Sequence, residues 1–368
     1  MTAPSSPSPE AQTPAGETSP APALSERGWG KLLIALVLFV VVPMIPHVRA
    51  ILPFEDTMLL FVPALAACTL VGWWAGGRAF LAIVWVGLAV GMAVQPAGTA
   101  GGNSFYNLER GWSLLLAGSF GLVCLFNPRR GLFGRASIAL GLTLVLAALM
   151  SLIGPVTMSQ AAKTVGEEFT RRNAETMSKF RTAIDMYPQQ WQEMVAKVPT
   201  LADMPAETDK QLTALASAGV SVFPALLALQ SLAALALAWA TYHRLSRARL
   251  GNPLRPLREF RFNDQLVWGL IVGLTIVLLP TLSSVRGVGK NLLVFFGALY
   301  AMRGFGVLAW FVAPGSLGVT LAVATVMLFA PVLQLFAALA FMLLGVGALV
   351  LGLGDTWADW RRRTGTPL

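Results

Sequence analysis

Charged residues are scarce in this chain. Only 12 % of its 368 residues are Asp, Glu, Lys or Arg, whereas 55 % are hydrophobic. Soluble globular proteins carry about 25 % charged residues, so water is excluded as the main solvent of the folded chain. Apolar runs long enough to cross a bilayer core, about 20 residues each, recur between Lys31 and Leu353. The composition therefore predicts a polytopic membrane protein.

Cysteine and histidine are almost absent. The two cysteines, Cys68 and Cys124, lie within predicted spans, and the two histidines, His47 and His243, stand at predicted span ends. Such a set supplies neither a disulfide framework nor the spacing of a zinc site. We expect no metal and no other cofactor.

Enzyme signatures are also missing. Residues 287–290 resemble the end of a phosphate-binding loop, but Ser284 stands where that loop needs its first glycine. Residues 118–121 lack the first glycine of a nucleophile elbow, and no pair of carboxylates lies within a span. The net charge of +9 is spread over short loops and forms no basic face for nucleic acid. We expect neither an enzyme nor a nucleic-acid-binding protein.

The apolar runs predict an all-α fold, a polytopic transmembrane helical bundle of about ten spans. Helices are expected because lipid leaves every backbone polar group to be satisfied within its own segment. The last run is too long for one crossing and is divided near Pro331, since proline disfavours a helical residue before it. The predicted spans are Lys31–His47, Thr57–Ala75, Ala79–Val94, Gly111–Phe126, Ala136–Pro155, Leu215–Tyr242, Gln265–Leu282, Asn291–Val312 and the two halves of Leu317–Leu353.

The distribution of basic residues predicts the orientation. Short cytoplasmic loops hold an excess of Lys and Arg. With a cytoplasmic N-terminus, fifteen basic residues fall in inside loops and four, Arg49, Arg110, Arg286 and Lys290, in outside loops. An even number of spans also brings the run at 361–363 inside. We therefore expect both termini in the cytoplasm of a bacterial cell, with the lipid bilayer as the main partner.

Composition divides the chain into five parts. Residues 1–26 are rich in Pro, Ala and Ser and predict a disordered cytoplasmic tail. Two membrane halves of five spans each, 27–155 and 214–354, flank a polar extracytoplasmic segment at 156–213. Residues 355–368 form a basic cytoplasmic tail.

The outer segment carries one apolar stripe. Its residues recur at steps of three and four, as on one face of a helix: Met177, Phe180, Ile184, Tyr187, Trp191, Met194 and Val198. Pro188 should end or restart the helix, so two helices are expected and no long coiled coil. The segment is interpreted either as a helical cap packed on the membrane portion or as a surface that binds a membrane protein partner.

Arg303 lies near the middle of a predicted span. A charge at the bilayer centre costs about 2.5–3.5 kcal/mol on insertion scales, so it needs compensation. No acidic residue lies in the middle of any predicted span, which favours an anionic small-molecule ligand at a site formed by Arg303, Gln230, Gln334 and Asn291. The alternative is that Arg303 bonds carbonyls or pairs with Gln230 or Gln334 inside the bundle.

The loop from His243 to Asp264 is the most basic part of the chain. Its arginines should contact anionic lipid headgroups or dock a cytoplasmic partner; they are Arg244, Arg247, Arg249, Arg255, Arg258 and Arg261.

Two glycine pairs have the spacing that lets helices approach closely in lipid. They are Gly87 with Gly91, and Gly269 with Gly273. We interpret both as packing sites.

Three short motifs carry a family resemblance. They are Leu257-Arg258-Glu259-Phe260-Arg261, then Arg303-Gly304 in a span opened by Asn291, and the closing Gly354-Asp355-Thr356-Trp357-Ala358-Asp359-Trp360-Arg361. With these motifs the chain resembles the YybS-like family of bacterial membrane proteins. That family is loosely similar to the substrate-binding components of energy-coupling-factor transporters. The resemblance implies a bundle that captures a small molecule, and it implies no catalytic residue.

Two functions follow from these features. The first is a membrane protein that binds or transports a small molecule, with Arg303 lining the site. The second is a cell-envelope scaffold that binds partner proteins through the outer segment and the basic loop. A polar cavity around Arg303 favours capture, whereas a sealed Arg303 and an exposed apolar stripe favour the scaffold.

Overall fold

The computed structural model describes residues 28–95, 103–128, 130–154, 156–247, 250–311 and 334–360, with side chains of the last helix described from Leu343. Every regular element in these ranges is a helix, which confirms the predicted all-α class. The predicted tail at 1–26 lies outside the described residues.

The helices follow one another with short connections. Their bounds are α1 Trp29–Val41, η1 Val42–Met44, α2 Pro46–Arg49, α3 Met58–Trp74, α4 Ala79–Val94, α5 Asn103–Phe126, α6 Leu132–Ile153, α7 Met158–Met186, α8 Pro188–Lys197, η2 Pro199–Asp203, α9 Met204–Ser221, α10 Phe223–Leu245, η3 Leu257–Glu259, η4 Asp264–Leu266, α11 Val267–Leu278, η5 Pro280–Val285, α12 Arg286–Phe311 and α14 Gln334–Ala358.

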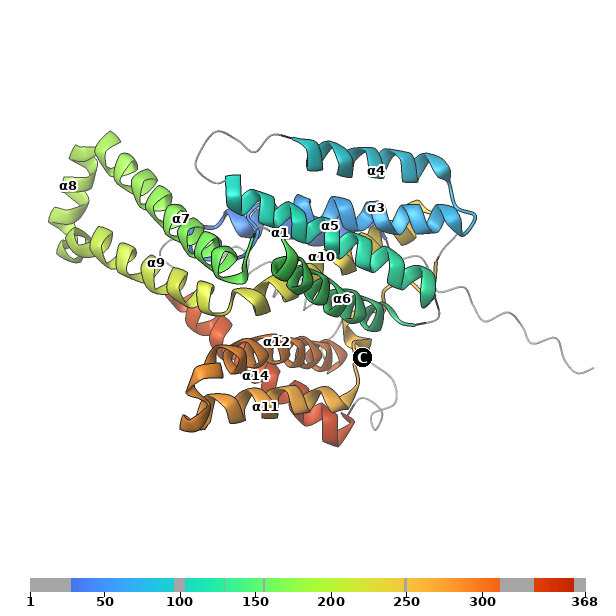
Figure 1. The fold of residues 1–368 in the computed structure, drawn as a ribbon. Helices are drawn as coiled ribbons and strands as arrows, with labels where there is room; N and C mark the ends of the chain where they lie inside the picture. The colour runs from blue at the N-terminus through green and yellow to red at the C-terminus, as the bar shows by residue number, and fades with distance from the viewer. Residues whose placement is uncertain are drawn as a thin grey trace, which may run out of the picture.

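The larger hydrophobic core lies around α3. This helix contacts α4, α5 and α10 and is buried on nearly all sides. Phe120 of α5 and Trp239 of α10 are fully buried beside it, with their rings edge to face at a centroid distance of 6.2 Å. A helix that is apolar all round must be covered by other helices or by lipid, and α3 therefore occupies the centre of the first group of helices (Figure 1).

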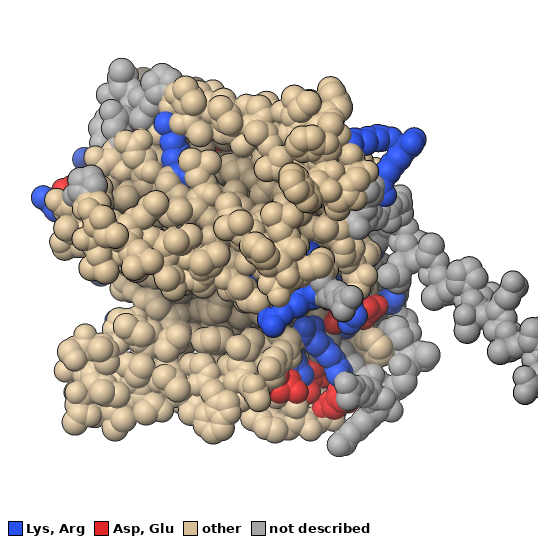
Figure 2. All heavy atoms as spheres, turned by 45° about the vertical axis from the view of Figure 1, so that its right-hand side comes forward, with Lys and Arg blue, Asp and Glu red and all other residues tan. Residues whose placement is uncertain are grey.

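A second group consists of α11, α12 and α14. The central helix α12 contacts the other two and also α10, which joins the group to the first one. Figure 2 shows that most of the visible surface lacks charge, that Lys, Arg, Asp and Glu lie mainly toward its right-hand side with a few toward its left, and that the surface is hollowed between the two groups. An uncharged girdle with charged ends is the surface that a bilayer requires.

Four described helices are long and apolar enough to cross a membrane, and five apolar helices are shorter. The four are Ser104–Phe126, Leu132–Ile153, Phe223–Leu245 and Pro280–Phe311, and the five are Trp29–Met44, Met58–Trp74, Ala79–Val94, Asp264–Leu278 and Leu343–Ala358. The number of ten spans stays a prediction, because residues 312–333, including the expected division at Pro331, lie outside the described part.

The predicted boundaries agree with the structure where polar residues flank the run. The helix Ala79–Val94 has the bounds expected. Others differ, because a helix can continue through polar residues once they have partners. The predicted Leu215–Tyr242 is two helices that meet at Val222, and the helix expected from Asn291 begins five residues earlier, at Arg286.

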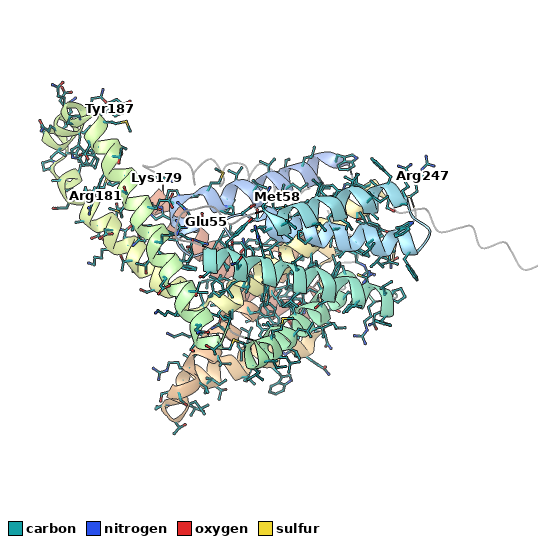
Figure 3. The ribbon with its side chains drawn as sticks, turned by 45° about the horizontal axis from the view of Figure 1, so that its top comes forward. Glu55, Met58, Lys179, Arg181, Tyr187 and Arg247 are labelled. Atoms are coloured by element: carbon teal, nitrogen blue, oxygen red, sulfur yellow. The ribbon has the colours of Figure 1, made fainter. Side chains whose placement is uncertain are left out.

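Helices α7, α8 and α9 form an arm at one end of the bundle (Figure 1). Thr157 begins α7 with a capping box to Gln160. The break expected at Pro188 is confirmed, since α7 ends at Met186 and α8 starts at Pro188. Two helices were expected in the segment, and α9 adds a third. In Figure 3 Tyr187 labels the tip, Glu55 lies where the arm meets the bundle, and Arg247 marks the opposite end. We call these the arm end and the basic end.

The closest contact between helices involves Gly304 of α12 and Gly352 of α14. A Cβ atom at Gly304 would overlap the Ala348 carbonyl oxygen, and one at Gly352 would overlap the Tyr300 carbonyl oxygen. Only glycine lets the two backbones approach in this way.

The predicted glycine pairs differ from each other. Gly269 lies against Phe296 and Gly273 against the Gly289 backbone, so this pair is a packing site as expected. The expectation for Gly87 and Gly91 is wrong, because neither has a neighbouring atom within 4 Å of an added Cβ.

Replacing Gly304 with Ala should destabilise the protein by at least about 1–3 kcal/mol, because the new methyl group forces backbone atoms apart. Gly347→Ala is the matched control, since this helical glycine of α14 has open space around it. Thermal unfolding of both variants in detergent micelles provides the comparison. Equal melting temperatures would contradict the close contact.

Candidate functional site

Arg303 is buried inside the second helix group and is fully paired. Its Nε donates to Asp355 Oδ2 at 3.0 Å, its Nη1 to Asp264 Oδ1 at 2.5 Å, and its Nη2 to the Asp355 carbonyl at 3.3 Å. Arg303 is 2 % exposed and Asp355 is fully buried. The guanidinium therefore holds the last turns of α14 and the start of α11 against α12.

The expectation that no acidic residue neutralises Arg303 is wrong. Asp355 lies in the last turn of α14, which packs along α12, and Asp264 lies in the loop that precedes α11, so both reach Arg303 from outside its own helix. Nearby, Arg261 Nη2 pairs with Asp359 Oδ1 at 2.6 Å. Among the described residues, these ion pairs join two cations to three carboxylates, so Arg303 is neutralised by acidic side chains. The role of Arg303 in ligand binding stays a prediction. The unpaired charge that suggested this role is not found, because Arg303 is paired.

The motifs that carried the family resemblance meet at this cluster. Arg261 comes from the first motif, Arg303 and Gly304 from the second, and Asp355 and Asp359 from the third. These residues lie far apart in the sequence and form one ion-paired unit at the basic end. Their joint role is to join loop 257–264, α12 and α14.

The other predicted ligand residues lie elsewhere. Gln230 exchanges two hydrogen bonds of 3.0 Å with the backbone of Phe54. Asn291 accepts from the Ala225 amide and donates to the Ser221 carbonyl, across the junction of α9 and α10. Neither contacts Arg303, which follows Asn291 by about 18 Å along α12. The side chain of Gln334 lies outside the described part.

The arginines of the basic loop have different surroundings. Arg244 Nη1 donates to the Ala240 carbonyl, and Arg261 is bound to Asp359. Arg247 and Arg255 are exposed, Arg258 is half-buried, and Arg249 lies outside the described residues. Lipid or partner contact by this loop stays a prediction.

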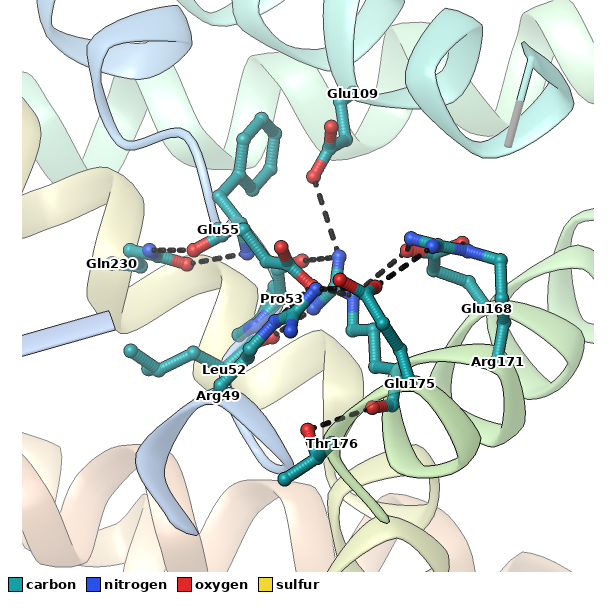
Figure 4. A network of polar contacts seen from close by, with 12 residues as sticks. Arg49, Leu52, Pro53, Glu55, Glu109, Glu168, Arg171, Glu175, Thr176 and Gln230 are labelled. Carbon is teal, nitrogen blue, oxygen red and sulfur yellow. Dashed lines mark hydrogen bonds and ion pairs between the residues drawn. The ribbon is translucent and has the colours of Figure 1, made fainter. Parts of the chain in front are cut away.

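A second charged cluster fixes the base of the arm (Figure 4). Arg172 of α7 is 2 % exposed, and its Nε lies 2.7 Å from Glu55 and 2.9 Å from Glu168. Its Nη1 and Nη2 donate to the carbonyls of Leu52 and Pro53 at 2.8 and 3.2 Å. The guanidinium of this buried arginine has carboxylates on one edge and carbonyl oxygens on the other, so its charge and its hydrogen-bond donors are compensated and the site is structural. It joins α7 to the loop before α3.

Glu175 extends this cluster along α7. It accepts from Lys179 at 2.7 Å and from Arg49 Nη2 at 2.9 Å. These two cations lower the pKa of Glu175 to about 2. At Glu168 burial alone would raise the pKa, but hydrogen bonds from Arg171 and Arg172 outweigh it and lower the pKa. Both carboxylates are therefore ionised at neutral pH.

Sequence reasoning missed this cluster. From the sequence, Arg49 and Glu55 were predicted to lie in loops, and Arg172 was predicted to lie in an outer segment whose charges nearly cancel, so nothing linked the three residues. The available signal was the spacing of Glu168, Arg171, Arg172 and Glu175, which places alternating charges on one face of a helix. It could not show that the face meets residues over a hundred positions earlier.

No group of His, Cys, Asp and Glu in the described residues is arranged to hold a metal ion. Both cysteines are buried and free.

The helical fold, the apolar girdle and the ion-paired ends together define an α-helical membrane protein. Residues 32–347 match the family described as predicted membrane protein (DUF2232), and the chain belongs to that family. Neither curated proteins nor solved structures gave a match to the chain. The YybS-like name and the similarity to energy-coupling-factor transporters stay predictions.

Replacing Arg303 with Met should destabilise the protein by about 3–5 kcal/mol, because it removes the cation that bonds the buried Asp355 and ties α14 to α12. The double variant Arg303→Met/Asp355→Leu should regain most of this loss. Chemical unfolding of the two single variants and the double variant gives the coupling energy. Additive effects would mean that the two side chains do not form the structural pair described.

Stability should also depend on Glu175 in acid. Its folded pKa is about 2 and lies below its ordinary value near 4.5, so its contribution is complete above pH 5 and is lost as pH falls toward 2. The difference in melting temperature between the wild type and Glu175→Gln should therefore shrink from pH 7 to pH 3. Glu193→Gln on α8 is the control and should show no such trend.

Proposed function

We propose that the protein is a non-enzymatic scaffold of the bacterial cytoplasmic membrane, whose arm binds a partner protein at the outer face. In this proposal the bundle crosses the bilayer ten times with both termini in the cytoplasm, as the basic residues favour. The single observation that carries it is an apolar tip on an arm with a fixed base.

The apolar stripe of the arm changes its environment along its length. Near the bundle, Met177 is buried with Leu212 of α9 and Ala50, and Phe180 packs against them. At the tip, Met186 is 64 % and Tyr187 60 % exposed. Met194, Val198 and Met204 are exposed as well. Single exposed apolar residues are normal, but a group of them on one projection is typical of an interaction site.

The base of the arm gives this tip a fixed position. Arg172 and Arg49 pair with acids of the arm and of the bundle, and Asn173 donates to Thr213 across α7 and α9 at 3.0 Å. Helix α7 has 29 residues and is about 44 Å long. A held arm of this length presents its tip away from the bundle at little cost in conformational entropy on binding.

The charges of the segment also favour a protein partner over a lipid surface. Residues 157–213 carry seven basic and eight acidic residues, so the arm has no net attraction to anionic headgroups. The paired state of Arg303 weakens the alternative of small-molecule capture, because the unpaired cation was its main support.

The proposal is tested by photo-crosslinking in living cells with the full chain. A crosslinking amino acid at Val198 should give one discrete protein adduct. The variant Met186→Ser/Tyr187→Ser/Met194→Ser should remove this adduct, because it takes away the apolar contact area at the tip. Mass spectrometry identifies the adduct, and an adduct between two copies of the chain would make the partner the protein itself.

The control replaces three exposed polar residues of α8 with serine, namely Gln189, Gln190 and Glu193. It should keep the adduct. A second control places the crosslinker at Lys163, which is exposed near the start of α7 and should give none. A tip variant with an undiminished adduct, or adducts with lipid alone, would refute the proposal.

A further inference from the structure

Arg135 is a buried cation without a counter-charge. It lies in the first turn of α6 and is fully buried, with its guanidinium carbon 4.2 Å from the centre of the Trp239 ring. Its Nη1 contacts Cys124 Sγ at 3.8 Å, which is a weak interaction at most. Its Nε and Nη2 are buried without a hydrogen-bond partner, and no carboxylate in the described chain pairs with it.

The contrast with the other two buried arginines is clear. Arg172 and Arg303 each have two or more carboxylates and at least one carbonyl oxygen. An uncompensated buried charge is strongly destabilising, so proteins rarely keep one without a use. The property that the sequence suggested for Arg303 belongs to Arg135.

The segments of the chain next to Arg135 and Trp239 in the sequence carry no acidic residue. Residues 110–166 contain no Asp or Glu, and neither do residues 210–258, which include α10 and most of the basic loop. Arg244 and Arg247 stand at the end of α10 that packs on α6. Arg247 is exposed at this end of the bundle (Figure 3). These arginines add positive charge on the side of α10 where Arg135 lies, which favours an anion there.

Arg135 lies directly beneath the surface. A Cβ atom at Gly251 would be 2.7 Å from its Nη2, and Gly251 itself is exposed with a φ of +73°. One turn of exposed loop thus separates the guanidinium from solvent.

We propose that Arg135 is the binding residue of an anion site that takes a phosphate group. The two unpartnered nitrogens, Nε and Nη2, form one edge of the guanidinium, and this edge binds two oxygens of a phosphate side by side. Stacking on Trp239 fixes the plane of the guanidinium group. Lysine has no planar group that could stack in this way. The phosphate belongs either to an anionic phospholipid headgroup or to a soluble phosphorylated compound. The site is separate from the arm and does not depend on the proposed scaffold.

The experiment measures the melting temperature of the purified full chain in detergent micelles. Two probes are titrated separately at constant ionic strength, inorganic phosphate and phosphatidylglycerol, with phosphatidylcholine as the neutral lipid. At saturation the charged probe should raise the melting temperature by about 2–4 °C. A response to phosphatidylglycerol alone identifies a lipid headgroup, and a response to inorganic phosphate identifies a soluble phosphate.

Arg135→Met should abolish this response, and the apparent affinity should fall about ten- to hundredfold. Arg286→Met is the matched control, because Arg286 is exposed at the arm end, and it should keep the response. Without probe, Arg135→Met should melt no lower than the wild type, since it removes an unpaired buried charge.

Arg135→Gln, which keeps hydrogen-bonding groups without the charge, carries the test if the methionine variant does not fold, and it should also lose the response. The proposal is overturned if neither probe stabilises the wild type. It is equally overturned if a variant of Arg135 responds as the wild type does.

Discussion

The arrangement of the helices depends on the free-energy cost of burying a charged side chain among apolar helices. In a low-dielectric medium a cation needs a carboxylate, a row of carbonyls or a bound anion, and the choice decides what the surrounding elements do. At Arg303 the partners come from two segments and join both to α12, and at Arg172 they join the arm to the bundle. Both arginines are thus parts of the architecture.

This constraint also explains which residues lie at the two ends of the bundle. Polar side chains such as Gln230 and Asn291 bind backbone groups where helices break, because lipid offers those groups no partner. The same requirement places the ion-paired clusters where chain turns are available to supply carboxylates. Function is then expected where a charge or an apolar surface is left over, at Arg135 and at the arm tip.

Much of the fold could be predicted from local sequence. Hydropathy predicted the helix Ala79–Val94 and the restricted backbone of Pro188 predicted the break before it, since both features depend on neighbours in the chain. The break at Val222 could not be seen, because Asn291 fixes it from 69 positions away. Gly304 was named only as part of a motif. Its contact with α14 could not be predicted from glycine spacing, because the second glycine of the contact, Gly352, lies on another helix.

The candidate sites were harder to predict for the same reason. Whether an arginine is neutralised depends on residues from other helices, so Arg303 appeared unpaired while Arg135 appeared to be an ordinary loop cation. Asp355 stands beyond the last predicted span, and the continuation of α14 past that span, packed on α12, brings it to Arg303. Periodicity gave the apolar stripe of the arm, but could not divide it into a buried half near Met177 and an exposed half near Tyr187.

The junction between α9 and α10 has a mechanical consequence. Asn291 bonds to both sides of Val222 and so holds the arm and a central bundle helix as one bent rod. That rod runs from the projecting tip to Trp239, on which Arg135 stacks at the other end. A displacement of the tip therefore bears on α10 through the bonds of Asn291 at this junction, and α10 leads from there to the side of the bundle where Arg135 lies.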